Sequence, residues 1–228
     1  MSNATSTLGI VVGLSAEARL LNDSGCVVAV GGGTPLGARR MAQKLVADGV
    51  TALISFGFAG GLDPAWCPGT LIVPDAVLFN GRLFDCNERL RAPLTGERIR
   101  CLLAGDAVVA LAEEKQRLWR TTGAGAVDLE SGEVAEVAET AGIPFAVLRA
   151  VLDPAGRDLP SAATSALDQY GRVAVLKMAG ILARHPVQII GLIALARDAS
   201  RARKALVGSA EGLRRLAAGD ANLRGLSP

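Results

Sequence analysis

Short, wholly apolar runs alternate with amphipathic stretches through the first two-thirds of the chain. Runs such as residues 8–13 (LGIVVG) and 52–56 contain no polar alternation, which is typical of strands buried on both faces. Further strands are expected at residues 26–30, 71–77 and 99–103, and in the segments that end at Asp128 and Asp153. Buried strands that alternate with helices predict an α/β fold, with a mostly parallel mixed central sheet flanked by helices on both faces.

The amphipathic stretches between these strands predict the helices. Thr34 and Pro35 have the residue types preferred at an N-cap and a first helical position, so a helix is expected from there to about Asp48. Other helices are expected at residues 16–21, from Asp106 to about Trp119, and after Glu130. The polar segment 85–97 predicts an irregular surface excursion. Beyond Pro160 the pattern predicts a helical C-terminus, with helices at residues 161–183 and 186–204 and a shorter one to about residue 218.

Length and composition limit the class of protein. A chain of 228 residues suits one domain, here residues 5–228, and the MSNA at residues 1–4 resembles the remnant of a cleaved tag. The net charge of +2 gives no support for a nucleic-acid partner. The four cysteines lack metal-ligand spacing and the chain has one histidine, so we expect no metal site and no cofactor.

The sequence also bears on location. We expect no signal peptide, because no basic segment followed by an apolar run opens the chain. The most apolar long segment, residues 173–196, is interrupted by charged residues and Pro186, which argues against a membrane span. Free thiols fit a reducing compartment. These features predict a cytoplasmic protein.

The chemistry is concentrated in residues 125–160, which predict a strand, a turn, a helix and a second strand. Asp128 and Glu130 lie where the first strand gives way to the helix, and Asp153 ends the second strand. In an open α/β sheet, ligands bind at the edge formed by the carboxyl ends of the strands. Asp128 and Glu130 could equally serve the start of the helix, where the helix dipole favours carboxylates in any protein.

Asp153 is the sharpest candidate for catalysis. It follows an apolar run and precedes Pro154, and a partly desolvated carboxyl at such a place can hold a proton and act as a general acid. Arg149 is unusual in a buried strand, and a structural ion pair is the alternative explanation for it. Glu17, just beyond the first strand, is a further acid at the same edge.

Two glycine-rich turns could approach a ligand. Residues 31–34 (GGGT) open a helix, so their backbone N–H groups could hold an anion, and a plain tight turn is the equal alternative. They are followed by no Lys-Ser/Thr pair, and no GxGxxG follows the first strand. Residues 57–61 (GFAGG) could let the backbone lie close to a ligand.

The ordered set of motifs resembles the nucleoside phosphorylase and nucleosidase superfamily, in particular its 5′-methylthioadenosine/S-adenosylhomocysteine nucleosidase branch. The resemblance runs from about residue 8 to 178 and rests on these segments: VVGLSAEARLL, GGGT, FGFAGGLDP, GTLIVPDAV, LLAGDAV and AVDLESGEVAEVAETAGIPFAVLRAVLD. It implies a phosphorylase/hydrolase-like fold, cleavage of a purine N-glycosidic bond, and a homodimer or higher oligomer.

The resemblance also implies roles for single residues. Asp153 would protonate N7 of the leaving purine, Glu17 would activate the attacking water, and Glu130 would bind the ribose hydroxyls. The supporting residues would be Leu129 under the sugar, Arg149 holding Glu130, and Ala59 and Gly60 along the base and sugar. If inorganic phosphate is the co-substrate, the candidate anion ligands are Gly33, Thr34 and Arg39.

Three positions depart from the family pattern and make the expected site more apolar. Phe58 replaces a hydroxyl residue, Val108 and its neighbour Val109 stand where an aromatic residue usually stacks on the base, and Leu152 replaces a serine. The short segment between Glu17 and the second strand, the segment LDPAGRDLP and the apolar C-terminal helices resemble the hopanoid-associated phosphorylases, which implies removal of adenine from adenosylhopane. A lipid-linked substrate would also imply contact with a membrane surface. Ordinary core packing is the alternative explanation for those helices.

Three functions therefore remain open. The first is a nucleosidase or phosphorylase that releases adenine from an adenosyl lipid in hopanoid biosynthesis. The second is the same chemistry on a small nucleoside such as methylthioadenosine. The third is a nucleoside-binding protein without catalytic activity.

Overall fold

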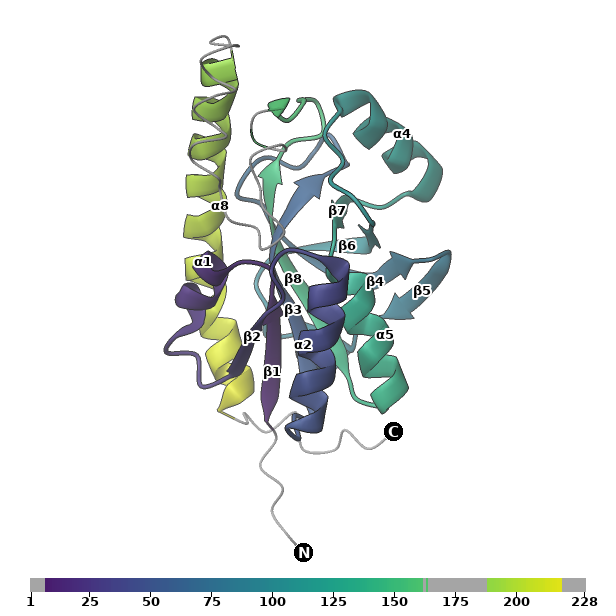
Figure 1. Ribbon diagram of the computed structural model, residues 1–228, viewed down its shortest axis with the longest axis vertical. Coiled ribbons are helices and arrows are strands. Elements are labelled where there is room, and N and C mark those ends of the chain that lie inside the picture. Colours follow the sequence, from purple (N-terminus) through teal and green to yellow (C-terminus); the bar gives the residue numbers. More distant parts are fainter. Residues whose placement is uncertain (1–6, 162, 164–187, 219–228) are drawn as a thin grey trace, which may run out of the picture.

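The computed structural model describes residues 7–161, 163 and 188–218 (Figure 1). Its central feature is an eight-stranded sheet with the order β2-β1-β3-β7-β6-β4-β5, in which β8 pairs with both β3 and β4. The strands are β1 (Leu8–Val12), β2 (Val27–Val30), β3 (Ala52–Gly61), β4 (Leu71–Phe79), β5 (Arg82–Asp85), β6 (Glu97–Ala104), β7 (Ala126–Asp128) and β8 (Phe145–Asp153).

The pairing of the strands confirms the predicted mixed, mostly parallel sheet. Strand β1 is parallel to β2 and β3, β3 is parallel to β8, and β6 is parallel to β4 and β7. The antiparallel pairs are β3 with β7, β4 with β5, and β4 with β8. The long strand β3 therefore joins the two halves of the sheet.

Helices cover both faces of this sheet, and alternation along the strands divides the core between them. The described helices are α1 (Ser15–Ala18), the 3-10 turn η1 (Arg19–Leu21), α2 (Pro35–Ala47), α3 (Glu88–Arg91), α4 (Ala112–Thr122), α5 (Ser131–Ala141) and α8 (Gln188–Ala217). Val11, Leu53 and Val147 pack on the face covered by α2 and α5. Ile10 and Ile54 pack on the other face, which α8 crosses (Figure 1). Such side-to-side alternation is what buried strands require.

Several boundaries differ from those predicted. Strand β3 does not end at Phe56 but continues through Gly61, because its glycine-rich part stays hydrogen-bonded to β8. The segment predicted to be irregular contains α3, and β5 immediately precedes it. The two last predicted helices form one helix, α8, because its buried positions continue without interruption through Leu206 and Leu213. The helix predicted at residues 161–183 and the proposed tag at residues 1–4 fall almost entirely outside the described residues.

The cysteines and the apolar helices were also subjects of prediction. All four cysteines are free, as expected, and Cys86 and Cys101 are buried. Within residues 7–161, 163 and 188–218, we find no helix whose length and apolar character would let it cross a bilayer.

Candidate active site

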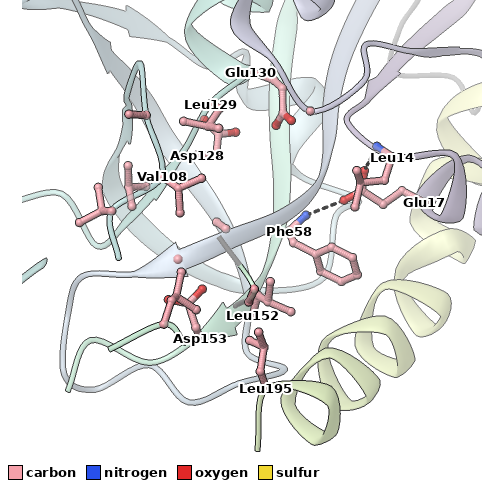
Figure 2. A pocket seen from close by; sticks show the side chains of 18 residues that line it. Leu14, Glu17, Phe58, Val108, Asp128, Leu129, Glu130, Leu152, Asp153 and Leu195 are labelled. Carbon is pink, nitrogen blue, oxygen red and sulfur yellow. Dashed lines mark hydrogen bonds between the residues drawn. The ribbon is translucent and has the colours of Figure 1, made fainter. Parts of the chain in front are cut away.

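A cavity of about 260 Å³ opens where several strands end (Figure 2). Its wall is mostly apolar, and its charged members are all carboxylates. The lining residues follow β1 and β2 (Leu14, Glu17, Gly33), lie on β3 (Phe58, Ala59, Gly60), follow β6 (Ala107, Val108, Val109), lie on or after β7 (Val127, Asp128, Leu129, Glu130), end or follow β8 (Leu152, Asp153, Leu159, Ala163), or come from α8 (Leu195).

Asp153 reaches the cavity from the last position of β8. The register between β8 and β3 shifts here: Ala59 faces Val151, whereas Gly60 faces Asp153, so Leu152 is the extra residue of a bulge. Both Leu152 and Asp153 line the cavity. Because Gly60 has no side chain, a Cβ built there would lie 3.6 Å from either carboxylate oxygen of Asp153. The bulge and the glycine together leave the carboxylate open to a ligand.

A buried lysine lies behind Asp153. The Lys115 ammonium forms an ion pair with Asp153 Oδ2, and the Lys115 side chain is fully buried. Burial raises the pKa of Asp153 above its usual range, and the nearby charges of Lys115 and Arg157 oppose that rise. A carboxyl group with a raised pKa is suited to hold a proton for a leaving group.

Arg149 is the centre of a second buried cluster. Its guanidinium forms ion pairs with Asp128 and with Glu130 (3.0 Å), and it donates hydrogen bonds to the hydroxyls of Ser55 (2.7 Å) and Ser131 (3.2 Å). Only 1% of Arg149 is exposed. It therefore holds Glu130 in place, as the resemblance implied, but it does not itself line the cavity.

Glu17 is held in the same region by backbone donors. The N–H of Leu14 donates to its Oε2 (2.7 Å), and the N–H of Phe58 donates to its Oε1 (3.0 Å). Burial raises the pKa of Glu17, while Arg149 and these backbone donors act in the opposite direction. Gly57 makes the arrangement possible, because it has a φ of +154° and a Cβ there would lie 2.5 Å from Glu17 Oε1 and 2.6 Å from an Arg149 nitrogen.

Glu17 and Glu130 converge on one side of the cavity. A Cβ built on Gly13 would lie 2.4 Å from Glu130 Oε1 and 3.4 Å from Glu17 Oε2. The lack of a side chain at Gly13 therefore leaves room for both carboxylates. Burial raises the pKa of Glu130 to about 7; Arg149 opposes the rise, and Asp128 and Glu17 add to it. In Figure 2, Asp153 lies apart from these two carboxylates, across the cavity.

The structure brings most of the predicted site residues into this cavity. Those that line it are Glu17, Gly33, Phe58, Ala59, Gly60, Val108, Leu129, Glu130, Leu152 and Asp153. Thr34 does not line it, and its hydroxyl instead accepts a hydrogen bond from the N–H of Gly37 (3.1 Å) as the N-cap of α2. Arg39, predicted as an anion ligand, does not line the cavity, and its guanidinium is paired with Glu133 and Glu136 where α2 packs on α5.

Asp128, interpreted from the sequence as a residue of the helix start, has two roles. It accepts a hydrogen bond from the N–H of Ser131 (3.2 Å) at the start of α5, and it forms the ion pair with Arg149. It is buried and lines the cavity.

Sequence reasoning missed Lys115 and the apolar residues Leu14, Leu159 and Leu195. In the sequence, Lys115 is one of several charged residues of α4 and nothing in its spacing distinguishes it.

The described residues contain no group of three or more His, Cys, Asp or Glu side chains that could hold a metal ion.

The phosphorylase superfamily model matches residues 17–102 and 98–185 of the chain. The protein therefore belongs to the phosphorylase superfamily.

The sequence is also similar to named relatives. It is 27% identical over 167 residues to 5′-methylthioadenosine/S-adenosylhomocysteine nucleosidases of Mycobacterium bovis and Mycobacterium tuberculosis, a match that covers 52% of this chain. The match spans 66% of the length of those relatives.

Solved structures share the fold. The S-adenosylhomocysteine nucleosidase of Streptococcus pyogenes superposes with a TM-score of 0.68 at 18% identity, covering 93% of this chain and 99% of that one. Futalosine hydrolase of Helicobacter pylori gives a TM-score of 0.60 at 18% identity, covering 65% of this chain and 88% of that one. At such identities the likeness shows the fold alone.

Proposed function

We propose that the protein cleaves the N-glycosidic bond of an adenosyl compound and releases adenine. The observation that carries the proposal is the cavity itself, in which Asp153 faces the carboxylates of Glu17 and Glu130 across a mostly apolar space. Membership of the phosphorylase superfamily and the similarity to the mycobacterial nucleosidases support the same reaction.

Each carboxylate has a role that its surroundings support. Asp153, with its raised pKa, donates a proton to N7 of the purine and makes it a better leaving group. Glu17 takes a proton from the attacking water. Glu130, fixed by Arg149, binds the ribose hydroxyls. As the bond breaks, positive charge develops on the ribose, and carboxylates held in a desolvated site stabilise that charge.

The charges around the cavity favour water over phosphate as the nucleophile. Among the described residues that line it there is no lysine, arginine or histidine. Arg149 is committed to Asp128 and Glu130, and Arg39 to Glu133 and Glu136. A phosphate dianion beside these carboxylates would be repelled, since like charges at short range in a low-dielectric site cost several kcal/mol. Of the three predicted anion-binding residues, Gly33 alone lines the cavity. We therefore favour hydrolysis over phosphorolysis.

The apolar wall supports a substrate with an apolar 5′ group, such as adenosylhopane. Leu14, Phe58, Leu152 and Leu195 border the cavity on the side of α8 (Figure 2). Such a wall offers few hydrogen bonds to a polar substituent but can bury an apolar one at about 25 cal/mol per Å². A lipid-linked substrate would bring the protein to a membrane surface. Methylthioadenosine is the second candidate, favoured by the similarity to the methylthioadenosine nucleosidases.

One experiment tests the proposal and separates the candidates. Adenosylhopane and methylthioadenosine are each incubated with the protein, with and without inorganic phosphate, and adenine is quantified by chromatography. We expect adenine from adenosylhopane without phosphate. Release only with phosphate would establish phosphorolysis, and no release from either substrate would refute the enzymatic function and leave a nucleoside-binding protein. Asp153→Asn should abolish release while circular dichroism and the melting temperature show an intact fold.

A further inference from the structure

Lys115 is a buried cation that the proposed reaction has not yet used. It lies on α4, none of its surface is exposed, and it does not line the cavity. Besides its ion pair with Asp153 Oδ2, its ammonium donates hydrogen bonds to the carbonyl oxygens of Pro154 (3.1 Å) and Arg157 (3.0 Å). A lysine ammonium has three N–H donors, and here each has an acceptor.

These contacts fix one oxygen of the proposed acid and leave the other available. Oδ2 of Asp153 is bound to Lys115, whereas no donor among the described residues is hydrogen-bonded to Oδ1. Asp153 lines the cavity, so the second oxygen is available to a ligand. The orientation of the carboxylate is therefore set from the side opposite the substrate.

The segment that follows Asp153 is held by α4 and α8. At the start of α4, the N–H of Ala112 donates to Asp158 Oδ1 (2.7 Å), and the N–H of Leu159 donates to the carbonyl of Ala110 (2.8 Å). On the other side, Arg157 forms an ion pair with Asp198 of α8. The charged groups that act on Asp153 are thus Lys115 from α4, Arg157 from the loop and Asp198 from α8.

We propose that Lys115 is a positioning residue for the general acid: it orients Asp153 towards the purine N7 and stabilises the carboxylate that remains after proton transfer. This inference rests on the proposed function. It adds a residue outside the cavity, on a helix that contributes no other charge to Asp153.

Protons and electron pairs are conserved in the proposed reaction. Asp153 starts as the neutral acid and gives its proton to N7, while the electron pair of the C1′–N9 bond goes to the purine. Water bonds to C1′ and gives a proton to Glu17. Asp153 ends as a carboxylate paired with the Lys115 ammonium, and the proton on Glu17 returns to Asp153 through solvent. Without Lys115, a buried carboxylate would form near Asp198, which is unfavourable.

If Lys115 served only to hold the loop after β8 in place, its replacement would have a different effect. Loss of that structural contact would impair every reaction in the cavity alike. Loss of a partner for the acid would impair only reactions whose leaving group needs a proton. Two leaving groups therefore distinguish the roles: adenine, which needs protonation at N7, and 4-nitrophenolate from 4-nitrophenyl riboside, which leaves without it.

The test compares the wild-type protein, Lys115→Met, Lys115→Arg and the surface control Lys44→Met, whose lysine pairs with Asp48 on α2. For Lys115→Met we expect kcat for adenine release to fall roughly 100-fold, KM to stay within about threefold, and nitrophenolate release to fall less than about fivefold. The high-pH limb of kcat should move to higher pH, because the Lys115 charge no longer opposes the raised pKa of Asp153. Lys115→Arg should restore part of the rate, and Lys44→Met should behave as wild type. Equal losses for both leaving groups, or no loss, would overturn the proposal.

A binding measurement decides the matter without turnover. The uncleavable nucleoside 9-deazaadenosine carries a hydrogen at N7 that can donate to an ionised, correctly oriented Asp153. We expect Lys115→Met to weaken its binding roughly tenfold at pH 7 in calorimetric titrations, a loss of about 1.4 kcal/mol, and to recover as the pH rises. An unchanged Kd would overturn the role of Lys115 even in a protein that releases no adenine, whereas the absence of adenine release from the wild type alone would refute only the proposed reaction.

Discussion

Replacing Glu130 with glutamine should make the folded protein more stable at alkaline pH, although it removes one partner of Arg149. The reason is that burial raises the pKa of Glu130 from 4.5 to about 7, so the folded protein must hold an unfavourable buried charge above that pH. Glutamine has nearly the same shape and never ionises. Arg149 keeps its ion pair with Asp128 in the variant.

The size and the sign of the change in folding stability with pH follow from linkage between proton binding and folding. Between pH 4.5 and about 7 the folded protein retains a proton on Glu130 that the unfolded chain has released, so stability falls as the pH rises through this range. At about 1.4 kcal/mol per pKa unit, the full loss is about 3 kcal/mol. This loss of stability is absent below about pH 4.5 and complete above about pH 8. Glu17 and Asp153, whose pKa values are also raised, should act in the same direction in both proteins.

The assay is urea denaturation of the wild type and Glu130→Gln at pH 5 and pH 8.5, followed by circular dichroism. The stability of the variant relative to the wild type should rise by about 3 kcal/mol between the two pH values. Glu139→Gln is the matched control on α5, because its carboxylate is half exposed and pairs with Arg82 on the surface. That control should change stability by less than about 1 kcal/mol at either pH. If the difference between wild type and Glu130→Gln is the same at both pH values, Glu130 is not the protonated group that the structure implies.

Three further substitutions test the surroundings of the cavity. Gly57→Ala should cost about 1–3 kcal/mol and displace Glu17, because of the positive φ and the close approach; the control Gly208→Ala, with open space around it, should not lower the melting temperature. Arg149→Met should destabilise the protein by about 3–5 kcal/mol, since it leaves buried carboxylates without a partner; a smaller loss in urea denaturation would show that they are neutral in the fold. Phe58→Ser should lower kcat/KM for a substrate with a long apolar 5′ group more than for methylthioadenosine, and an equal effect on both would contradict contact between Phe58 and that group.

The fold was largely predictable because its signals are local. An apolar run without alternation indicates a strand buried on both faces, and the runs before Asp128 and Asp153 end where β7 and β8 end. The extent of β3 was not predictable in this way. Glycines weaken a strand in isolation, but pairing of β3 with β8 keeps residues 57–61 in the sheet.

The site was predictable only where one residue carries the signal. Asp153 ends β8 and Glu130 lies two residues after the end of β7, and these positions sufficed to identify them as candidates. The position of Lys115 depends on how α4 packs against the loop after β8, a tertiary contact between positions 38 apart in sequence. The ion pairs of Arg39 have the same origin, because the packing of α2 on α5 supplies carboxylates that the local sequence does not reveal. The raised pKa of Glu130 likewise has a tertiary origin, because burial is its main cause and Asp128 and Glu17, from separate segments, add to the rise while Arg149 opposes it.

The bulge at Leu152 has a consequence for how chain length is tolerated at this site. Gly57 pairs with Arg149 and Gly60 pairs with Asp153, so four steps along β8 match three along β3, and the strict alternation of side chains is broken between Arg149 and Asp153. A deletion of one residue between them would allow regular pairing of β8 with β3, but it would remove the bulge through which two consecutive residues, Leu152 and Asp153, both line the cavity. Among chains of this kind, the number of residues between the arginine and the aspartate should therefore be kept wherever this bulge shapes the wall of the cavity.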